Sequence, residues 1–187
     1  MKTGIRLVML VAVAAALLAG VVIWRRTPAP PVPVATPPPA SPGALVQALP
    51  DPVVSMEQLA IRLTNEQRAQ AGLAPLDPDP SLSAAARSHS EDMLRRQFFD
   101  HVNPDHESPQ DRAARLTGSP VVGVGENIWM WSGAVVPARE ALVRQAIGEW
   151  MASAAHRENL LRPGYRRIGA GVAVEDGQVR VTAVFSE

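Results

Sequence analysis

The chain has 187 residues and equal numbers of basic and acidic side chains, 18 of each, so its formal net charge is zero. This length favours one folded domain with appended segments over two full domains. The first 50 residues hold no acid and four of the basic residues, which are Lys2, Arg6, Arg25 and Arg26. The remaining body is mildly acidic and has no lysine, so it offers no basic stripe and we expect no nucleic-acid partner. With no cysteine, the chain can form neither disulfide bonds nor a thiol nucleophile.

Residues 1–26 are predicted to be a signal anchor that crosses the membrane. Leu7 to Trp24 is a run of 18 residues without charge, flanked by basic residues at both ends. A helix of this length spans roughly 27 Å, close to the thickness of the hydrocarbon core. A cleaved signal peptide is the alternative, but the apolar run is long for one and no small-x-small site precedes a polar mature start. We therefore expect a membrane-anchored protein whose folded part lies in the periplasm or outside the cell, secreted if the segment is cleaved.

Residues 27–51 are predicted to be a proline-rich linker. Half of residues 27–42 are proline, which fixes φ and favours an extended polyproline helix. At about 3.1 Å per residue, this segment would hold the body on the order of 50 Å from the membrane. We interpret it as a spacer in preference to a docking motif for a proline-binding partner, and place the folded domain at residues 52–187.

Within this domain the sequence predicts several helices. Their starts are a capping box at Ser55 and Gln58, Asp79 before Pro80, Ser108 before Pro109, and Pro137. We expect the first three to end near Gly72, Phe98 and Leu116. The last runs through Met151 and is followed by one or two turns ending near Leu161.

Alternating apolar residues predict strands. Residues 121–131 form one candidate, and it contains Glu126. Residues 168–174 and 179–185 alternate around Asp176-Gly177, a sequence typical of a tight hairpin turn. Helices followed by a closing hairpin predict an α+β domain in which helices cover an antiparallel sheet.

Three short phrases carry the candidate chemistry, namely Phe99-Asp100-His101, Gly125-Glu126-Asn127 and His156-Arg157-Glu158-Asn159. His101, Glu126 and His156 supply two imidazoles and a carboxylate, a set that can hold a divalent metal or transfer protons. They lie far apart in the sequence, so only the fold can gather them. HExxH, GxSxG and phosphate-binding glycine loops are absent from the sequence.

Each candidate also has a purely structural interpretation. His101 would cap nearby carbonyl groups, and Glu126 would form an ion pair with a core arginine, since a lone buried carboxylate costs several kcal/mol. His89 is either a satisfied core histidine or part of the same cleft. Asn159 is expected to bond backbone groups, and His106 to be solvated.

Together these segments closely resemble the bacterial branch of the CAP superfamily, also called SCP domains, which groups cysteine-rich secretory proteins, antigen 5 and plant pathogenesis-related proteins. The likeness covers about residues 55–187. Its matching segments, in order, are Leu63–Arg68 with Gly72 and Leu76, Ala86–Met93, Phe99–His101, Gly125–Ile128, Trp150–Ser153 and His156–Leu161.

The resemblance implies a three-layer α-β-α sandwich outside the cytoplasm, with a cleft lined by His and Glu that binds zinc or a similar ion in several members. By motif, His101 and Glu126 match two cleft residues. His156 of the bacterial branch would complete a His-Glu-His metal set, with His89 and Asn159 beside it. Eukaryotic members carry a Glu where this chain has Ser153, and a His in the final strand pair, where this chain has none.

Two functions are compatible with these expectations. One is an envelope-associated module that binds a divalent metal and captures lipid, peptide or cell-wall ligands. The alternative is a metal-dependent hydrolase acting on envelope peptides or glycans, with Glu126, His101 and His156 as catalytic candidates. The fold itself does not choose between them.

Overall fold

The computed structural model describes residues 51–135 and 137–187. Its elements are α1 (Pro52–Gln70), β1 (Asp77–Pro78), α2 (Pro80–Arg95), α3 (Pro109–Thr117), β2 (Gly125–Ser132), α4 (Arg139–Ala152), α5 (Ala154–Leu160), β3 (Arg167–Glu175) and β4 (Gln178–Ser186). The predicted signal anchor and residues 27–50 of the linker lie outside the described residues. Within the described ranges, no helix has both the length and the apolar character that a membrane span requires.

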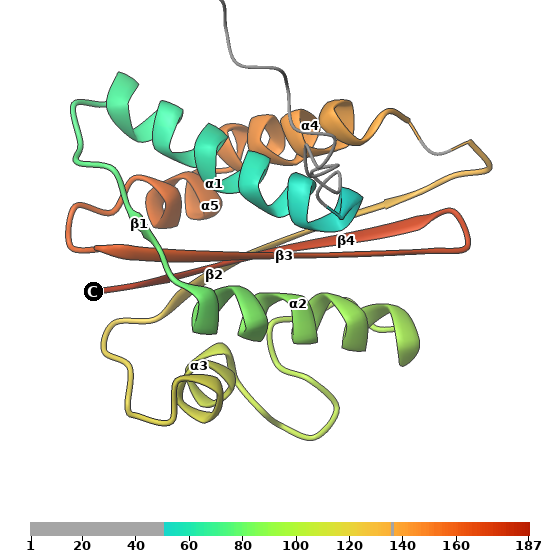
Figure 1. Cartoon of the computed structure of the whole chain (residues 1–187), viewed down its shortest axis with the longest axis horizontal. Helices are drawn as coiled ribbons and strands as arrows, with labels where there is room; N and C mark the ends of the chain where they lie inside the picture. Colours follow the sequence, from blue (N-terminus) through green and yellow to red (C-terminus); the bar gives the residue numbers. More distant parts are fainter. Residues whose placement is uncertain (1–50, 136) are drawn as a thin grey trace, which may run out of the picture. The chain divides into compact units, whose positions relative to one another are not determined.

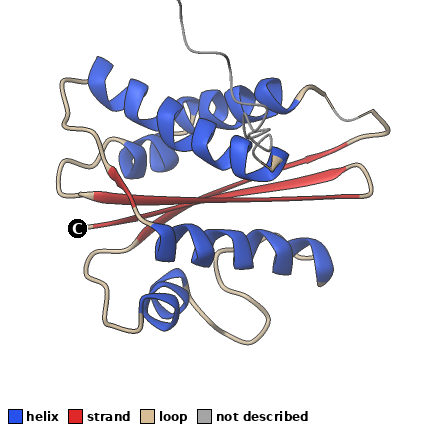
Figure 2. Cartoon of the chain, in the orientation of Figure 1, coloured by secondary structure: helices blue, strands red, loops and turns tan. Residues whose placement is uncertain are grey.

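The elements form three layers around one sheet (Figure 1). The strand order is β1-β3-β4-β2, and all neighbouring strands run antiparallel except the two-residue β1, which pairs with β3 in parallel. Helices α1, α4 and α5 cover one face of the sheet, and α2 and α3 cover the other (Figures 1 and 2). The expected α+β architecture with an antiparallel core is therefore confirmed, and the short parallel strand is an addition that the sequence pattern did not predict.

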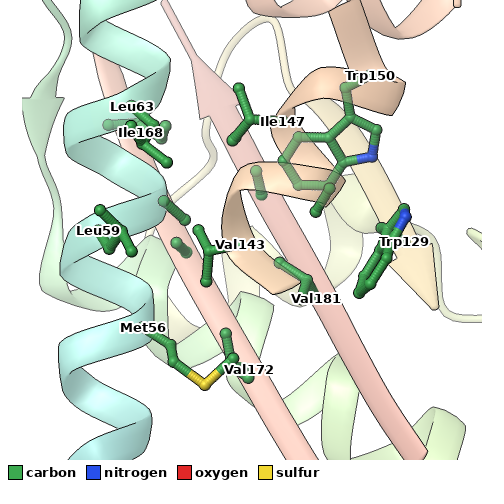
Figure 3. Close-up of a cluster of buried hydrophobic side chains, with 14 of the residues drawn as sticks. Met56, Leu59, Leu63, Trp129, Val143, Ile147, Trp150, Ile168, Val172 and Val181 are labelled. Carbon is green, nitrogen blue, oxygen red and sulfur yellow. The ribbon is translucent and has the colours of Figure 1, made fainter. Parts of the chain in front are cut away.

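The main core fills the space between α1, α4 and the sheet (Figure 3). Met56 of α1 reaches toward Val172 of the final hairpin, and Leu59 and Leu63 belong to the same buried cluster as Ile147 and Trp150 of α4. On the other face, α2 packs against β3 at very short range. A Cβ atom added to Gly171 would lie 1.9 Å from the backbone nitrogen of Arg87. This face therefore combines close backbone packing at glycine with a smaller apolar cluster that includes Leu82 and Val184.

Three predicted helix boundaries were wrong. Helix α4 begins at Arg139 and not at Pro137. Helix α1 begins at Pro52, and the Asp51 carboxylate accepts from the Val53 amide at 2.7 Å, so Asp51 is the N-cap and Ser55 lies inside the helix. Helix α2 ends at Arg95, three residues early. There Gln97 takes a left-handed φ of 54°, and the amide of Phe98 donates to the Met93 carbonyl at 3.2 Å. This closes the helix as a Schellman motif.

Strand β2 is also shorter than predicted. It begins at Gly125 and not at Val121, because Gly123 has a φ of 60° that interrupts the extended backbone. The strand still carries Glu126 into the interior of the domain. Its eight residues pair with β4, placing Glu126 opposite Val184 and Asn127 opposite Ala183.

Candidate functional site

The centre of the site is a buried ion pair between β2 and α3. Arg112 Nη2 lies 2.8 Å from Glu126 Oε2, and the two side chains are only 2% and 1% exposed. The same guanidinium donates to the carbonyls of Glu107, at 2.8 Å, and His101, at 2.9 Å. Arg112 therefore neutralises Glu126 and also fixes the loop that carries His101. A core arginine as partner is the structural interpretation that the sequence left open for Glu126.

His101 is the accessible member of this cluster. Its Nδ1 lies 2.9 Å from Glu126 Oε1, and its side chain is 46% exposed. The hydrogen bond to the Glu126 carboxylate raises the pKa of His101, against the opposing effects of partial burial and of the Arg112 charge. Because a carboxylate accepts hydrogen bonds, Nδ1 carries the proton and Nε2 is the nitrogen left for a ligand. His101 thus binds a carboxylate, whereas the alternative interpretation had it capping carbonyl groups.

His89 lies underneath the site. It is 1% exposed, its Nε2 is 2.9 Å from the Asp100 carbonyl oxygen and 3.8 Å from Glu126 Oε1, and its ring packs against Phe98. Burial lowers the pKa of His89. The structure therefore brings His89 close to Glu126 from the interior of the domain, whereas His101 approaches the same carboxylate from the exposed side.

His156 and Asn159 approach β2 from its opposite face, on α5. Asn159 Nδ2 donates to the Glu126 carbonyl at 3.1 Å, so its side chain bonds the backbone, as expected from the sequence. Asn127 Nδ2 donates to the His156 carbonyl at 2.9 Å. Partial burial, followed by the charge of His101, lowers the pKa of His156. The His156 imidazole therefore lies within electrostatic reach of His101, although in the described ranges no hydrogen bond or ion pair joins it to Glu126.

Gly125 leaves room for the hydroxyl of Tyr165. A Cβ atom at this position would lie 2.0 Å from Tyr165 Oη and 3.0 Å from Asn159 Oδ1. The Tyr165 hydroxyl itself donates to Asn159 Oδ1 at 3.4 Å. The glycine, the tyrosine and the asparagine thus fix the junction between α5 and β2, and no motif in the sequence pointed to Tyr165.

The geometry around Glu126 bears on the predicted metal set of His101, Glu126 and His156. Within residues 51–135 and 137–187, no three His, Asp or Glu side chains are grouped so as to hold an ion. Both Glu126 oxygens already have partners, and the guanidinium of Arg112 would repel a second cation at the same carboxylate. Glu126 does not fit the role of a direct ligand in this arrangement, and the binding of a metal by His101 and His156 stays a prediction.

The comparisons with known proteins agree with this fold and motif order. The model of the cysteine-rich secretory protein family, CAP, matches residues 61–185. The chain belongs to the CAP family. Its relatives include the uncharacterized protein YkwD of Bacillus subtilis, which is 36% identical over 130 residues, 70% of this chain and 47% of YkwD.

Two further relatives extend the comparison. The uncharacterized membrane protein YlbC of Bacillus subtilis is 34% identical over 116 residues, 62% of this chain and 31% of YlbC. The crystal structure of an extracellular protein containing an SCP domain from Bacillus anthracis matches with a TM-score of 0.57 and 28% identity, over 72% of this chain and 41% of that one. This chain spans less than half the length of each of these three relatives.

Proposed function

We propose that this CAP domain is a ligand-binding module on the outer side of a membrane, and that His101 makes the first contact with the ligand. The observation that carries the proposal is a half-exposed imidazole held at 2.9 Å by a buried carboxylate whose charge Arg112 already neutralises. Such support fixes the orientation of the ring before a ligand arrives, which lowers the cost of ordering it on binding.

The ligand is expected to combine a polar group with an apolar portion. When His101 is protonated, its charge and that of Arg112 together exceed the single negative charge of Glu126, so in that state the cluster favours an acceptor or an anion, such as a lipid headgroup or a peptide carboxylate. Phe99 and Val102 flank His101 and are 43% and 42% exposed. Large apolar side chains left open beside a polar group are typical of ligand contacts.

The location outside the cytoplasm rests on the predicted signal anchor and on the relatives. One relative is named as an extracellular protein and another as a membrane protein. In the proposed arrangement the N-terminal segment anchors the chain, the proline-rich linker spaces it, and the domain meets envelope components.

Hydrolysis of envelope peptides or glycans is the second candidate. A carboxylate that orients an imidazole is also the arrangement of a general base. The predicted metal-dependent version would need Glu126 to give up Arg112, so the observed pairing favours binding.

The test is an NMR titration of the purified full-length chain, observed at His101 Nε2 in the wild type and at the backbone amides in both the wild type and the variants. The probes are a short-chain phosphatidylglycerol, a tripeptide with a free carboxylate and soluble cell-wall fragments. We expect one probe class to shift this resonance saturably, and His101→Ala to abolish its binding. His106→Ala is the matched control, because His106 is an exposed loop histidine five residues away.

Two results would decide against the proposal. Binding that is unchanged in His101→Ala would place the ligand elsewhere. Mass-spectrometric detection of cleaved probe, lost in Glu126→Gln, would show that the protein is an enzyme.

A further inference from the structure

A groove of about 670 Å³ lies on the outer side of α1, between this helix and Pro78 of β1. It runs along α1 from Gln58 to Ala69, which is roughly 17 Å, or three helical turns. Its exposed surface is mostly apolar, and its lining includes the partly buried side chain of Ile61. Helix α1 covers the sheet face opposite to α2 and α3, whose connecting loop carries His101 (Figure 1). The groove is therefore separate from the candidate site.

The wall of the groove that faces α1 is held in place by Asn65. Its Nδ2 donates to the Leu76 carbonyl at 3.0 Å, and the Leu76 amide donates to its Oδ1 at 2.8 Å. These two hydrogen bonds tie α1 to the segment that leads into β1. The groove is therefore formed before a partner arrives, which lowers the cost of ordering it on binding.

The two walls favour a helix as the partner. Strand β1 is an edge of the sheet, but Pro78 has no amide proton to donate to an added strand, and the Asp77 amide already donates to the Arg166 carbonyl at 2.8 Å. The α1 wall presents side chains three and four residues apart between Gln58 and Ala69. Rows with this spacing interdigitate with the rows of another helix.

One positive and one negative side chain line the groove, Arg62 and Glu66. Both are exposed, and neither forms an ion pair within the described residues. They lie four residues apart with the arginine first, which is the weaker order for a pair within one helix. Because the two charges cancel, the groove is complementary to a surface that carries the same two charges in the opposite order.

Helix α1 of a second copy is such a surface. When a two-fold axis passes at the level of Thr64, midway between the two charges, the helices run antiparallel and Arg62 of each copy faces Glu66 of the other. We propose that two copies of this chain pair in this way. The contact is one groove wide, so the dimer is expected to be weak and reversible, as interfaces below about 1,200 Å² commonly are.

Pairing through α1 leaves the opposite face of each domain uncovered. The dimer would therefore offer two His101 side chains at once, and a ligand that reaches both would bind more tightly than to one. The pairing itself does not depend on the role proposed for His101.

The experiment measures the dissociation constant of the full-length chain in detergent micelles by sedimentation equilibrium. We expect the wild type to dimerise. Arg62→Glu places like charges at both contacts, and so does Glu66→Arg, so each variant should dimerise about tenfold more weakly. An equal mixture of the two variants restores opposite charges at both contacts and should recover the wild-type affinity. Arg144→Glu and Glu140→Arg, on the exposed surface of α4, are the matched controls and should dimerise as the wild type does.

Three results would overturn the proposal. A wild type that stays monomeric would leave the groove to a partner of another kind. Association that neither charge reversal weakens would come from another surface, such as the predicted signal anchor. Loss of the dimer in both variants without recovery in their mixture would mean that Arg62 and Glu66 do not face each other.

Discussion

Replacing Arg112 by methionine tests whether the buried ion pair organises the site. The change removes three hydrogen bonds, to Glu126 and to the carbonyls of His101 and Glu107, and leaves the Glu126 carboxylate buried beside His101. Breaking one partner out of a buried pair costs about 3–5 kcal/mol, a large share of the 5–15 kcal/mol that holds a typical domain together. We expect this loss in the free energy of unfolding, measured by urea titration with tryptophan fluorescence, which buried Trp129 and Trp150 supply.

The control and the double variant make this prediction falsifiable. Arg115→Met, three residues along the same helix, removes a pair in which the arginine is 52% exposed, and it should cost no more than about 1 kcal/mol. In Arg112→Met/Glu126→Gln, the cost should fall short of the sum of the single costs by about 2 kcal/mol, because either change alone already breaks the pair. Costs that add in the double variant, or an Arg112→Met cost equal to that of Arg115→Met, would refute the reasoning.

Three further predictions follow from the same geometry. Pairing with Glu126 raises the pKa of His101, so the wild type should be more stable than His101→Gln below pH about 6.5. The difference in the free energy of unfolding should vanish as pH rises through the pKa of His101 in the folded state. Unfolding curves of both proteins from pH 5 to 9 check this. Calorimetry with Zn²⁺ should show weak binding to the wild type and tighter binding to Arg112→Gln, because this change frees Glu126 Oε2 from its arginine partner. Tight binding to the wild type that Glu126→Gln abolishes would contradict this. Gly125→Ala should lower the unfolding midpoint because its Cβ overlaps Tyr165 Oη, and Tyr165→Phe in the same chain should restore part of the loss; no rescue would contradict this.

The sequence was sufficient to predict the turns and helix caps that depend only on residues close together in the chain. The Asp176-Gly177 turn has φ values of 45° and 72°, the left-handed pair that a tight hairpin requires. The caps at Asp79 and Ser108 were also confirmed, since each side chain accepts from amides of its own first turn. The start of α1 was predicted too late, at the Ser55 capping box. Asp51 caps the helix instead, and Val53 in its first turn packs against the main core.

The partner of Glu126 could not be chosen from the sequence. Arg112 and Arg115 occupy the same short helix and look alike on local grounds, yet Arg112 is 2% exposed and Arg115 is 52% exposed. Only the packing of α3 against β2 separates them. The sequence did raise a core arginine as an alternative to a metal, because a buried carboxylate needs a positive partner of some kind. The sequence therefore predicts that Glu126 has a positively charged partner, and the fold shows that this partner is Arg112.

The alternation of side chains along β2 explains why two adjacent residues, Glu126 and Asn127, serve two layers of the domain. Glu126 faces α2 and α3, where it meets His89, His101 and Arg112, while Asn127 faces α5 and bonds the His156 carbonyl. Successive residues of a strand point to opposite faces, so a shift of one residue in the pairing of β2 with β4 would exchange them. The carboxylate would then face α5, and the amide would face Arg112. The register of this edge strand therefore places the charge of Glu126 under His101, and any ligand that His101 binds depends on it.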